Sequence, residues 1–499
     1  MKDGFIRVAA ATPDIHVADP QYNSEQIIEL MEQGSARGVK VMAFPELCLT
    51  AYTCSDLFLQ ESLLREAKKE LKRILQASKS KDMILFVGMP WMHKGKLYNV
   101  AAVLNRGRIL GIVPKKHLPN YSEFYELRHF NPGMEKVEMT DWEGVQVPMG
   151  MNLLFACRTM PELVLAAELC EDVWVPCPPS ISHALAGATV IANCSASDET
   201  TGKDQYRYNL ICGQSARLVC GYIYANAGEG ESSQDLVFGG QNIIAENGTC
   251  LVQSDRFKNA CICADLDLGR IISERRRMTT FRDEENRSAS YETVYFELNT
   301  EDSAKKDSKK AGQKRDELLR YIDPAPFVPH DAGQRERRCE EILSIQAMGL
   351  KKRLAHTNCK HAVIGLSGGL DSTLALLVTV RAFDMLQIPR ENIHCITMPC
   401  FGTTDRTYTN ACTMAKKTGA SLTEINIRDA VTGHFKDINH DIEKHDVTYE
   451  NGQARERTQI LMDIANQTNG MVIGTGDMSE LALGWATYNG DHMSMYGVN

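Results

Sequence analysis

The sequence predicts an α/β protein with two domains. From residue 5 onward, short apolar segments alternate with amphipathic segments of helical length, a pattern typical of sheets covered by helices. A polar, lysine-rich stretch over residues 301–315 lacks any apolar period and indicates a linker. Beyond it, a buried strand, a glycine turn and a helix follow one another over residues 361–383, which favours a parallel sheet wound on both faces.

Length and composition limit the classes of function. The 499 residues suffice for two to four domains at roughly 150 residues each. A net charge of -9 argues against a nucleic-acid surface, and no apolar run reaches the ~18 residues of a membrane span. The N-terminus lacks the apolar region of a signal peptide. Sixteen scattered cysteines without a Cys-x-x-Cys pair predict reduced thiols, and hence a cytoplasmic protein.

The first domain is expected over residues 1–295. Its strands are predicted at residues 5–11, 39–44, 83–88, 98–104, 108–113, 163–167, 189–194 and 221–225. Helices are predicted at 23–38, with Ser24 as the N-cap, at 61–80 and at 204–219. A turn at residues 105–107 joins two of the strands in a hairpin.

Three polar residues stand at predicted strand ends, where α/β domains gather catalytic groups. Glu46 ends Val-Met-Ala-Phe-Pro-Glu, Lys115 follows Ile-Val-Pro, and Cys170 follows Ala-Ala-Glu-Leu. A carboxylate can take the proton of a thiol, the thiolate can attack an amide carbon, and a cation can stabilise the resulting oxyanion. The adjacent Lys116 is an alternative to Lys115.

These three motifs resemble the Glu-Lys-Cys triad of the nitrilase, or carbon–nitrogen hydrolase, family over roughly residues 1–290. The resemblance implies an αββα sandwich, and the register Pro-Lys-x-His-Leu favours Lys115 over Lys116. It also implies a second acid near the lysine, which we assign to Glu123. In glutamine-using relatives, the amino-acid end of the substrate is held at the positions of Tyr121, Glu171, Ser197 and Lys203.

The second domain is expected over residues 326–499, after a linker at 296–325. Strands are predicted at 362–366, 392–398, 422–425 and 471–473, and helices at 335–356, from 371 to about 383, and at 411–418. Residues 450–457 are expected to precede a further helix. This order again indicates a doubly wound parallel sheet.

The Ser-Gly-Gly-Leu-Asp-Ser segment at 367–372 predicts an anion site. Glycines allow close approach of the backbone, and the first N–H groups of the following helix point at the ligand. No Gly-Lys-Ser/Thr is present, so the segment is not a Walker A loop. It resembles the pyrophosphate loop of the ATP pyrophosphatase family. This resemblance implies ATP contacts from Gly365, Leu366, Ser367, Gly368, Gly369, Leu370, Asp371, Ser372, Met398 and Thr475.

Two further motifs, Asn-Gly-Gln-Ala-Arg-Glu-Arg from Asn451 and Gly-Thr-Gly-Asp-Met-Ser-Glu from Gly474, are similar to those of NAD synthetases. Together with the first domain, they resemble the glutamine-dependent NAD synthetase family. The resemblance implies deamido-NAD contacts from Asn451, Arg455, Glu480 and Trp485. Asp371 and Glu480 are then the candidate Mg²⁺ ligands, because hard oxygen donors with phosphates suit that ion. Family members continue beyond the position of Asn499, so an incomplete second domain is expected.

The resemblance implies an ATP-dependent carbon–nitrogen ligase that uses glutamine as amido donor, acts with ATP and Mg²⁺ on deamido-NAD, and forms a homo-oligomer without nucleic-acid or membrane partners. Two alternatives stay open at this point. One is another glutamine-fed adenylylating enzyme, of an asparagine- or tRNA-modifying type. The other is an amidase whose C-terminal half is an inactive, truncated synthetase.

Overall fold

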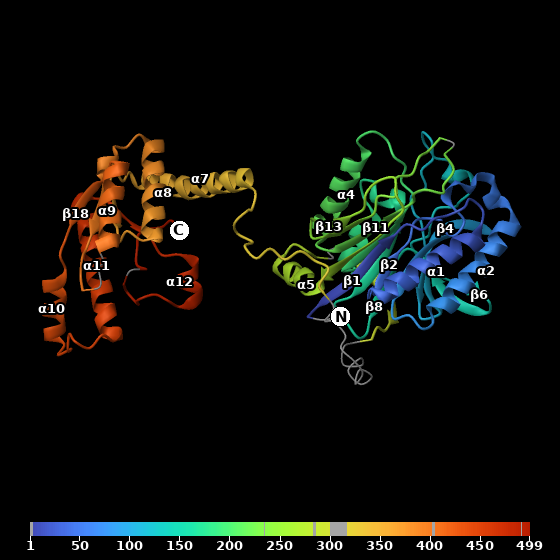
Figure 1. The fold of residues 1–499 in the computed structure, drawn as a ribbon, viewed down its shortest axis with the longest axis horizontal. Coiled ribbons are helices and arrows are strands. Elements are labelled where there is room, and N and C mark those ends of the chain that lie inside the picture. Colours follow the sequence, from blue (N-terminus) through green and yellow to red (C-terminus); the bar gives the residue numbers. More distant parts are fainter. Residues whose placement is uncertain (1–2, 234, 283–285, 300–316, 402–404, 491) are drawn as a thin grey trace. The chain divides into compact units, whose positions relative to one another are not determined.

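The computed structural model describes residues 3–233, 235–282, 286–299, 317–401, 405–490 and 492–499. It divides into two compact units, residues 1–322 and 323–499, coloured blue to yellow and yellow to red in Figure 1. Each unit is described by itself. No helix among these residues combines the length and the apolar character that crossing a bilayer requires.

Two sheets build the described part of the first unit. The first has the order β14 (Cys261–Asp267), β1 (Phe5–Ala11), β2 (Val41–Ala43), β3 (Ile84–His93), β4 (Lys96–Asn105), β5 (Arg108–Pro114), β7 (Val145–Met149) and β6 (Glu138–Trp142). The second has the order β13 (Thr249–Gln253), β12 (Ile243–Glu246), β11 (Gly221–Asn226), β10 (Val190–Ser195), β9 (Val164–Leu169), β8 (Leu153–Cys157) and β15 (Glu292–Phe296).

The two sheets pack face to face over one apolar core. Val8 and Phe86 of the first sheet and Phe155 of the second belong to this core. The outer face of the first sheet packs against α1 (Pro20–Ala36) and α2 (Glu61–Ser78), and that of the second against α3 (Pro179–Leu185) and α4 (Lys203–Leu218). A further helix, α5 (Leu268–Arg277), follows β14 (Figure 1). The expected αββα sandwich is confirmed.

The N-cap of the first helix differs from the prediction. Asp19, not Ser24, caps α1, because Asp19 accepts a hydrogen bond from Tyr22 N, and Pro20 suits the first helical position. Ser24 is buried one turn further on, where its hydroxyl donates to Glu70 of α2 at 2.5 Å.

Most of the expected linker, including residues 301–315, lies outside the described residues. Residues 317–322 belong to the first unit. Leu319 N donates to Asp265 at 2.6 Å, and the Arg320 guanidinium makes two hydrogen bonds of 2.7 Å to Glu246.

The second unit contains a parallel sheet of order β18 (Ser421–Glu424), β17 (Ile393–Thr397), β16 (Ala362–Gly365), β19 (Met471–Gly474) and β20 (Tyr496–Gly497). One core contains residues of α7 (Ala332–Thr357), α8 (Leu370–Leu386) and α9 (Asp405–Thr418), and a second contains residues of α10 (Arg428–Asp437) and α11 (Val447–Thr468). The expected doubly wound sheet is confirmed.

The strand order reverses between β16 and β19, and ligands of such sheets bind at the carboxyl ends of the strands at this point. The Ser-Gly-Gly loop follows β16, and Thr475 follows β19. Residues 450–457, by contrast, lie inside α11 and not before it. Asp446 caps this helix by accepting hydrogen bonds from Thr448 N and Tyr449 N.

Candidate active sites

Cys170 lies in a strained turn at the carboxyl end of β9. It opens a short 3₁₀ helix, η3 (Cys170–Val173), and has a φ of 38°, which is uncommon for a residue other than glycine. Its N–H donates to Asn193 Oδ1 at 3.1 Å. The side chain is buried, with 6% of the residue exposed. A strained backbone held by surrounding hydrogen bonds is typical of a functional residue.

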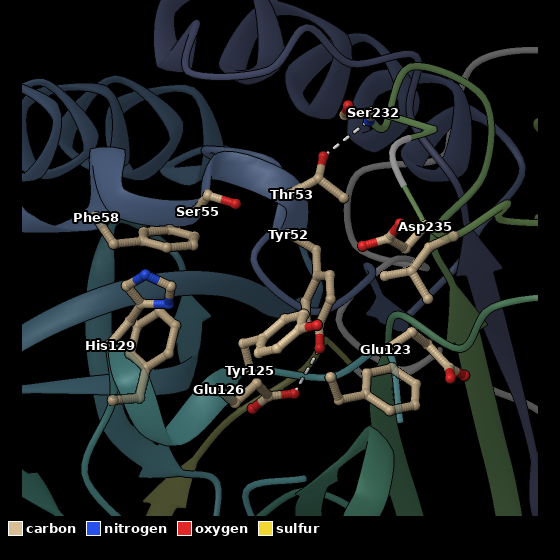
Figure 2. A pocket seen from close by; sticks show the side chains of 13 residues that line it. Tyr52, Thr53, Ser55, Phe58, Glu123, Tyr125, Glu126, His129, Ser232 and Asp235 are labelled. Carbon is tan, nitrogen blue, oxygen red and sulfur yellow. Dashed lines mark hydrogen bonds between the residues drawn. The ribbon is translucent and has the colours of Figure 1, made fainter. Parts of the chain in front are cut away.

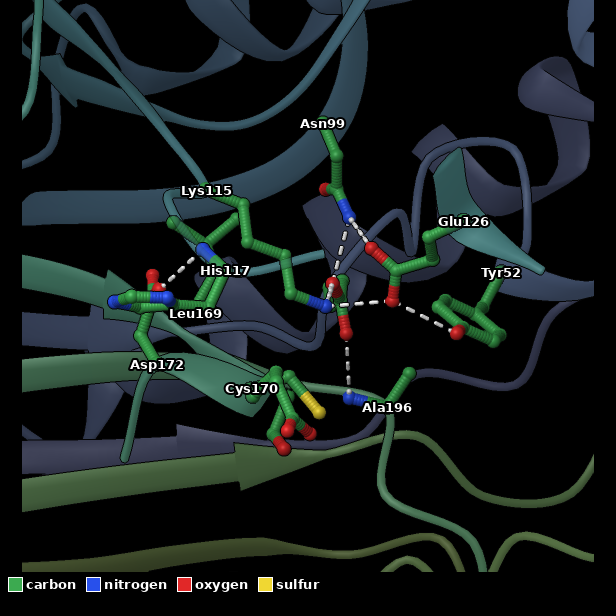
Figure 3. A network of polar contacts seen from close by, with 12 residues as sticks. Tyr52, Asn99, Lys115, His117, Glu126, Leu169, Cys170, Asp172 and Ala196 are labelled. Carbon is green, nitrogen blue, oxygen red and sulfur yellow. Dashed lines mark hydrogen bonds and ion pairs between the residues drawn. The ribbon is translucent and has the colours of Figure 1, made fainter. Parts of the chain in front are cut away.

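Glu46 and Lys115 form a buried ion pair that faces the same region. Glu46 follows β2 and Lys115 follows β5, and Lys115 Nζ lies 2.6 Å from Glu46 Oε1. Ala196 N donates to the other oxygen of Glu46 at 3.1 Å. Figure 3 shows Lys115, Cys170 and Ala196 grouped around one point. The structure therefore brings the three strand-end residues together.

The second acid at the lysine is Glu126, which corrects the assignment to Glu123. Glu126 Oε1 lies 2.6 Å from Lys115 Nζ and accepts a hydrogen bond from the Tyr52 hydroxyl at 2.8 Å (Figure 3). Asn99 Nδ2 adds hydrogen bonds to Glu46 Oε1 at 2.6 Å and to Glu126 Oε2 at 3.5 Å. A 3₁₀ turn at Glu126–Arg128 buries Glu126, whereas Glu123 lies three residues earlier in the loop.

Glu123 lines a pocket whose wall is largely aromatic (Figure 2). Tyr52, Phe58, Phe124, Tyr125 and Phe130 form much of this wall. Glu126 and Tyr52 belong both to the pocket and to the lysine network, so the pocket reaches the buried acid.

Asp172 ties the lysine loop to the cysteine turn. Its buried carboxylate accepts hydrogen bonds from Leu169 N at 3.1 Å and from His117 N at 2.9 Å (Figure 3). Two segments far apart in the sequence are thus fixed through one side chain.

Burial and charge set the protonation states of the site. Burial, followed by the Glu46 carboxylate, raises the pKa of the Cys170 thiol, so the thiol needs a base. Burial lowers the pKa of Lys115, but Glu126 and Glu46 outweigh it and hold this pKa well above its usual value. Burial raises the pKa of Glu126 to about 7, against the opposing effect of Lys115. The arrangement therefore supplies a permanent cation beside a thiol and a carboxylate.

The residues assigned to glutamine form two hydrogen-bonded groups near Cys170. The exposed Tyr121 donates its hydroxyl proton to Glu171 Oε1 at 2.9 Å. Lys203 pairs with Asp198 and lies 5.4 Å from the ring centre of Trp174. Arg207, fully buried, donates to Ser197 Oγ at 3.3 Å and to Asp198 O at 3.0 Å.

In the second unit, hydrogen bonds from its own serine hydroxyl groups fix the conformation of the Ser-Gly-Gly loop. Ser367 Oγ accepts from Gly369 N at 3.2 Å and lies 3.2 Å from Ser372 Oγ. Gly368 has a φ of +81°, and a Cβ there would lie 2.0 Å from Thr407 O. The remaining assigned residues of the loop are Gly365, Leu366, Leu370 and Asp371, of which Leu366 is buried and Leu370 and Asp371 are exposed.

Asn499 joins the loops that follow β16 and β19. Its Nδ2 donates to Asp371 O at 2.9 Å and to Thr475 O at 2.8 Å. Met398 is buried just after β17, and a Cβ at Gly365 would lie 3.7 Å from its Cε. The residues assigned to ATP are therefore brought together around the switch point.

The residues assigned to deamido-NAD lie on α11 and on the segment around α12 (Met478–Leu483). Asn451 Oδ1 accepts from Thr487 Oγ1 at 2.9 Å, and Arg455 Nε donates to Tyr488 O at 3.1 Å. Glu480 forms a capping box with Asp477, and Trp485 is 80% exposed.

Comparison with known proteins gives two family models and a series of relatives. Residues 7–276 match the carbon–nitrogen hydrolase family, and residues 342–495 match the NAD synthase family. The glutamine-dependent NAD(+) synthetase of Mycobacterium leprae is 42% identical over 507 residues, which cover 99% of this chain and 73% of the relative. The chain belongs to the glutamine-dependent NAD(+) synthetase family.

Two further members of the glutamine-dependent NAD(+) synthetase family share lower identity with this chain. The Aquifex aeolicus relative is 29% identical over 98% of this chain and 77% of its own length. The crystal structure of the Cytophaga hutchinsonii member aligns with a TM-score of 0.48 and 23% identity, covering 98% of this chain and 78% of that one.

The expected Mg²⁺ ion fits the donors of the synthetase half if substrate phosphates supply the remaining ligands. The described residues contain no cluster of three or more His, Cys, Asp or Glu side chains that could hold a metal. Asp371 and Glu480 offer carboxylate oxygens, and Mg²⁺ is commonly bound through one or two carboxylates plus substrate phosphates.

The residues of the first site that were not anticipated include Glu126, Asn99, Asp172 and Asn193, as well as Tyr52 and Arg207. Asn99 and Asn193 could have been identified from the sequence, because each is a polar residue flanked by apolar residues within a buried strand. Such a side chain needs buried partners, and here the partners belong to the site.

Proposed function

We propose that this chain synthesises NAD⁺ from deamido-NAD, with ATP as activator and glutamine as the source of nitrogen. The observation that carries the proposal is the buried Glu46–Lys115–Cys170 group, which occurs in a chain whose second unit has a glycine loop at the switch point of a parallel sheet.

The first half releases ammonia from glutamine. Glu46 takes the proton of the Cys170 thiol, and the thiolate attacks the side-chain amide carbon. The Lys115 ammonium stabilises the oxyanion of the tetrahedral intermediate. Glu46 returns the proton to the leaving nitrogen, so ammonia departs and a thioester remains. Water then hydrolyses the thioester to glutamate and restores the thiol.

Four residues recognise the amino-acid end of glutamine in this proposal. Tyr121 and Glu171 face the ammonium group, and Ser197 and Lys203 face the carboxylate. The hydrogen bond between Tyr121 and Glu171 and the position of Lys203 beside Asp198 support these roles.

The second half activates the acceptor. A carboxylate oxygen of deamido-NAD attacks the α-phosphorus of ATP and pyrophosphate leaves. Ammonia then attacks the acyl carbon, and AMP leaves as NAD⁺ forms. The backbone of the 367–372 loop and Thr475 bind ATP, whereas Asn451, Arg455, Glu480 and Trp485 bind deamido-NAD. Asp371 and Glu480 would hold Mg²⁺, which when bound neutralises charge on the phosphates.

We also propose that the enzyme works as a cytoplasmic homo-oligomer. The described cysteines form no disulfide bond, as expected of a reducing compartment. Ammonia is mostly protonated in neutral water, and an assembly that encloses its path would keep it reactive.

The test is the variant Cys170→Ala, assayed for AMP and NAD⁺ with glutamine and with ammonium in turn. We expect loss of glutamine-driven synthesis and retention of ammonium-driven synthesis. Equal loss of both by a folded variant would contradict the two-site division. If the unaltered chain forms AMP only with an acceptor other than deamido-NAD, it is another glutamine-fed adenylylating enzyme. If it hydrolyses glutamine without forming any AMP, it is an amidase with an inactive synthetase half.

A further inference from the structure

A chain of buried polar groups runs from β9 through β11 to the backbone of the nucleophile. Cys170 N–H donates to Asn193 Oδ1, and Asn193 Nδ2 donates to the Tyr222 hydroxyl at 3.0 Å. The Tyr222 hydroxyl donates in turn to Glu168 Oε1. Asn193 and Tyr222 are completely buried, and Glu168 is 1% exposed.

We infer that Glu168 and Tyr222 are positioning residues for Cys170, acting by fixing the direction of the Asn193 carboxamide. The inference rests on the proposed role of Cys170 as nucleophile. It adds two residues that touch neither the thiol nor the expected substrate.

Each end of this chain of hydrogen bonds is a backbone N–H group, which can donate a hydrogen bond but cannot accept one. One end is the N–H of Cys170, and the other is Ser180 N, which donates to Glu168 Oε2 at 2.8 Å. Burial raises the pKa of Glu168 to about 7, so above this pH the carboxylate is ionised and accepts at both oxygens, and the hydroxyl of Tyr222 donates to it. The oxygen of that hydroxyl is then free to accept from Asn193 Nδ2, and Asn193 must turn its own oxygen toward Cys170.

The nucleophile needs this acceptor. A non-glycine residue with positive φ is strained and persists only where neighbouring groups hold it. The Asn193 contact satisfies the buried N–H of the strained residue. If the carboxamide were reversed, two N–H groups would face each other, and the turn that aims the thiol would shift.

Glu168→Gln tests the direction of the hydrogen bonds with almost no change in volume. Glutamine has one side-chain oxygen, which accepts the hydrogen bond from Ser180 N–H. The NH₂ group then faces Tyr222, so the Tyr222 hydroxyl must accept a hydrogen bond from it and can no longer donate there. Tyr222→Phe breaks the chain one step later. The matched control is Tyr291→Phe, which removes a different tyrosine hydroxyl, hydrogen-bonded at 2.7 Å to His183.

The variants are compared by kcat and KM for glutamate release and by ammonium-driven NAD⁺ formation. A third measurement is the rate at which the small electrophile chloroacetamide alkylates Cys170, with the modified residue identified by peptide mapping. We expect Glu168→Gln and Tyr222→Phe to lower kcat about 10- to 100-fold with little change in KM, as for a misplaced catalytic group. Alkylation of Cys170 should slow in parallel, and ammonium-driven synthesis should persist. An unchanged circular dichroism spectrum and thermal unfolding transition show that the first unit of each variant folds.

Normal kcat and normal alkylation in folded Glu168→Gln and Tyr222→Phe would overturn the inference, as would an equal loss in Tyr291→Phe. A change confined to KM would overturn it too. Should one variant fail to fold, the other decides. Absence of glutaminase activity in the unaltered chain is a different result, because it contradicts the proposed function itself.

Discussion

The ammonium of Lys115 lies 2.6 Å from a carboxylate oxygen of Glu126, and both side chains are buried. Because Lys115 is also paired with Glu46, one cation is shared between two acids. Glu126 thereby weakens the electrostatic effect of Lys115 on Glu46, the residue that we propose as the base for the thiol.

Glu126→Gln should lower the rate of glutamine hydrolysis by at least about 10-fold, because Lys115 then pairs with Glu46 alone and weakens it as a base. Glutamate release measures the effect. Glu123→Gln is the control from the same loop, and we expect near-normal activity from it. The reverse ranking of the two variants would restore Glu123 as the second acid.

The pH dependence of glutamine hydrolysis should report the same residue. Burial raises the pKa of Glu126 to about 7, so Glu126 gains a proton as the pH falls through this value. The protonated form resembles Glu126→Gln, and we therefore expect kcat to fall on the acid side of pH 7. In Glu126→Gln this limb should disappear, and its persistence would assign the titration to another group.

Arg207→Lys should destabilise the first unit. The buried guanidinium donates to Glu199 and to Gln241, each at 2.6 Å, as well as to the segment that carries Ser197. A lysine cannot reproduce this fork, and losing a charged hydrogen bond costs about 1.5–3 kcal/mol in the free energy of unfolding. Thermal unfolding measures the change. Arg217→Lys, an exposed position on the same helix, is the control, and an equal effect there would contradict this account.

Gly368→Ala should abolish ATP-dependent activity and spare glutaminase. Alanine at a φ of +81° is strained, and its Cβ would lie 2.0 Å from Thr407 O, so the loop must move. We expect ammonium-driven AMP formation to fall by about 100-fold or more, as for a misplaced binding group. Gly433→Ala in α10 meets no atom within 4 Å and serves as the control. Normal AMP formation in Gly368→Ala would show that the loop does not bind ATP.

His183 should make the first unit less stable in acid. Burial lowers the pKa of His183 to about 4, below its usual 6.5. A lowered folded-state pKa contributes stability that is present above pH 6.5 and is lost as the pH falls toward 4, by up to ~3 kcal/mol. The melting temperature of His183→Gln should therefore depend less on pH between 6.5 and 4. An unchanged slope would exclude His183 as the titrating group.

The sequence predicted the residues whose signal is local. Glu46, Lys115 and Cys170 each follow an apolar strand, and the sheets bring these strand ends together. The glycine loop is equally local, because a strand, two glycines and a helix define it. In the second sheet, β9, β10 and β11 were predicted, but β8, β12, β13 and β15 were not. β12 and β13 are short, and β13 is half-exposed, so their apolar signal is weak.

Side-chain partners could not be predicted in the same way. Glu123 and Glu126 lie in one loop and have the same chemistry, and only the 3₁₀ turn after Tyr125 decides which of them reaches Lys115. Asp172 meets His117 across 55 residues, and no periodicity encodes that contact. Residues 450–457 lie within α11 because the helix begins earlier, at Val447, where Asp446 caps it.

The depth of Cys170 has a practical consequence for anyone who titrates the thiols of this enzyme. Cys177 and Cys339 are exposed, whereas Cys170, the proposed nucleophile, is buried and its thiol has a raised pKa. Bulky maleimides and disulfide reagents should consume the surface sulfurs first, leaving turnover intact. The number of thiols modified per chain is therefore a poor measure of the number of active sites. A small electrophile that resembles a carboxamide is the better reagent for titrating them.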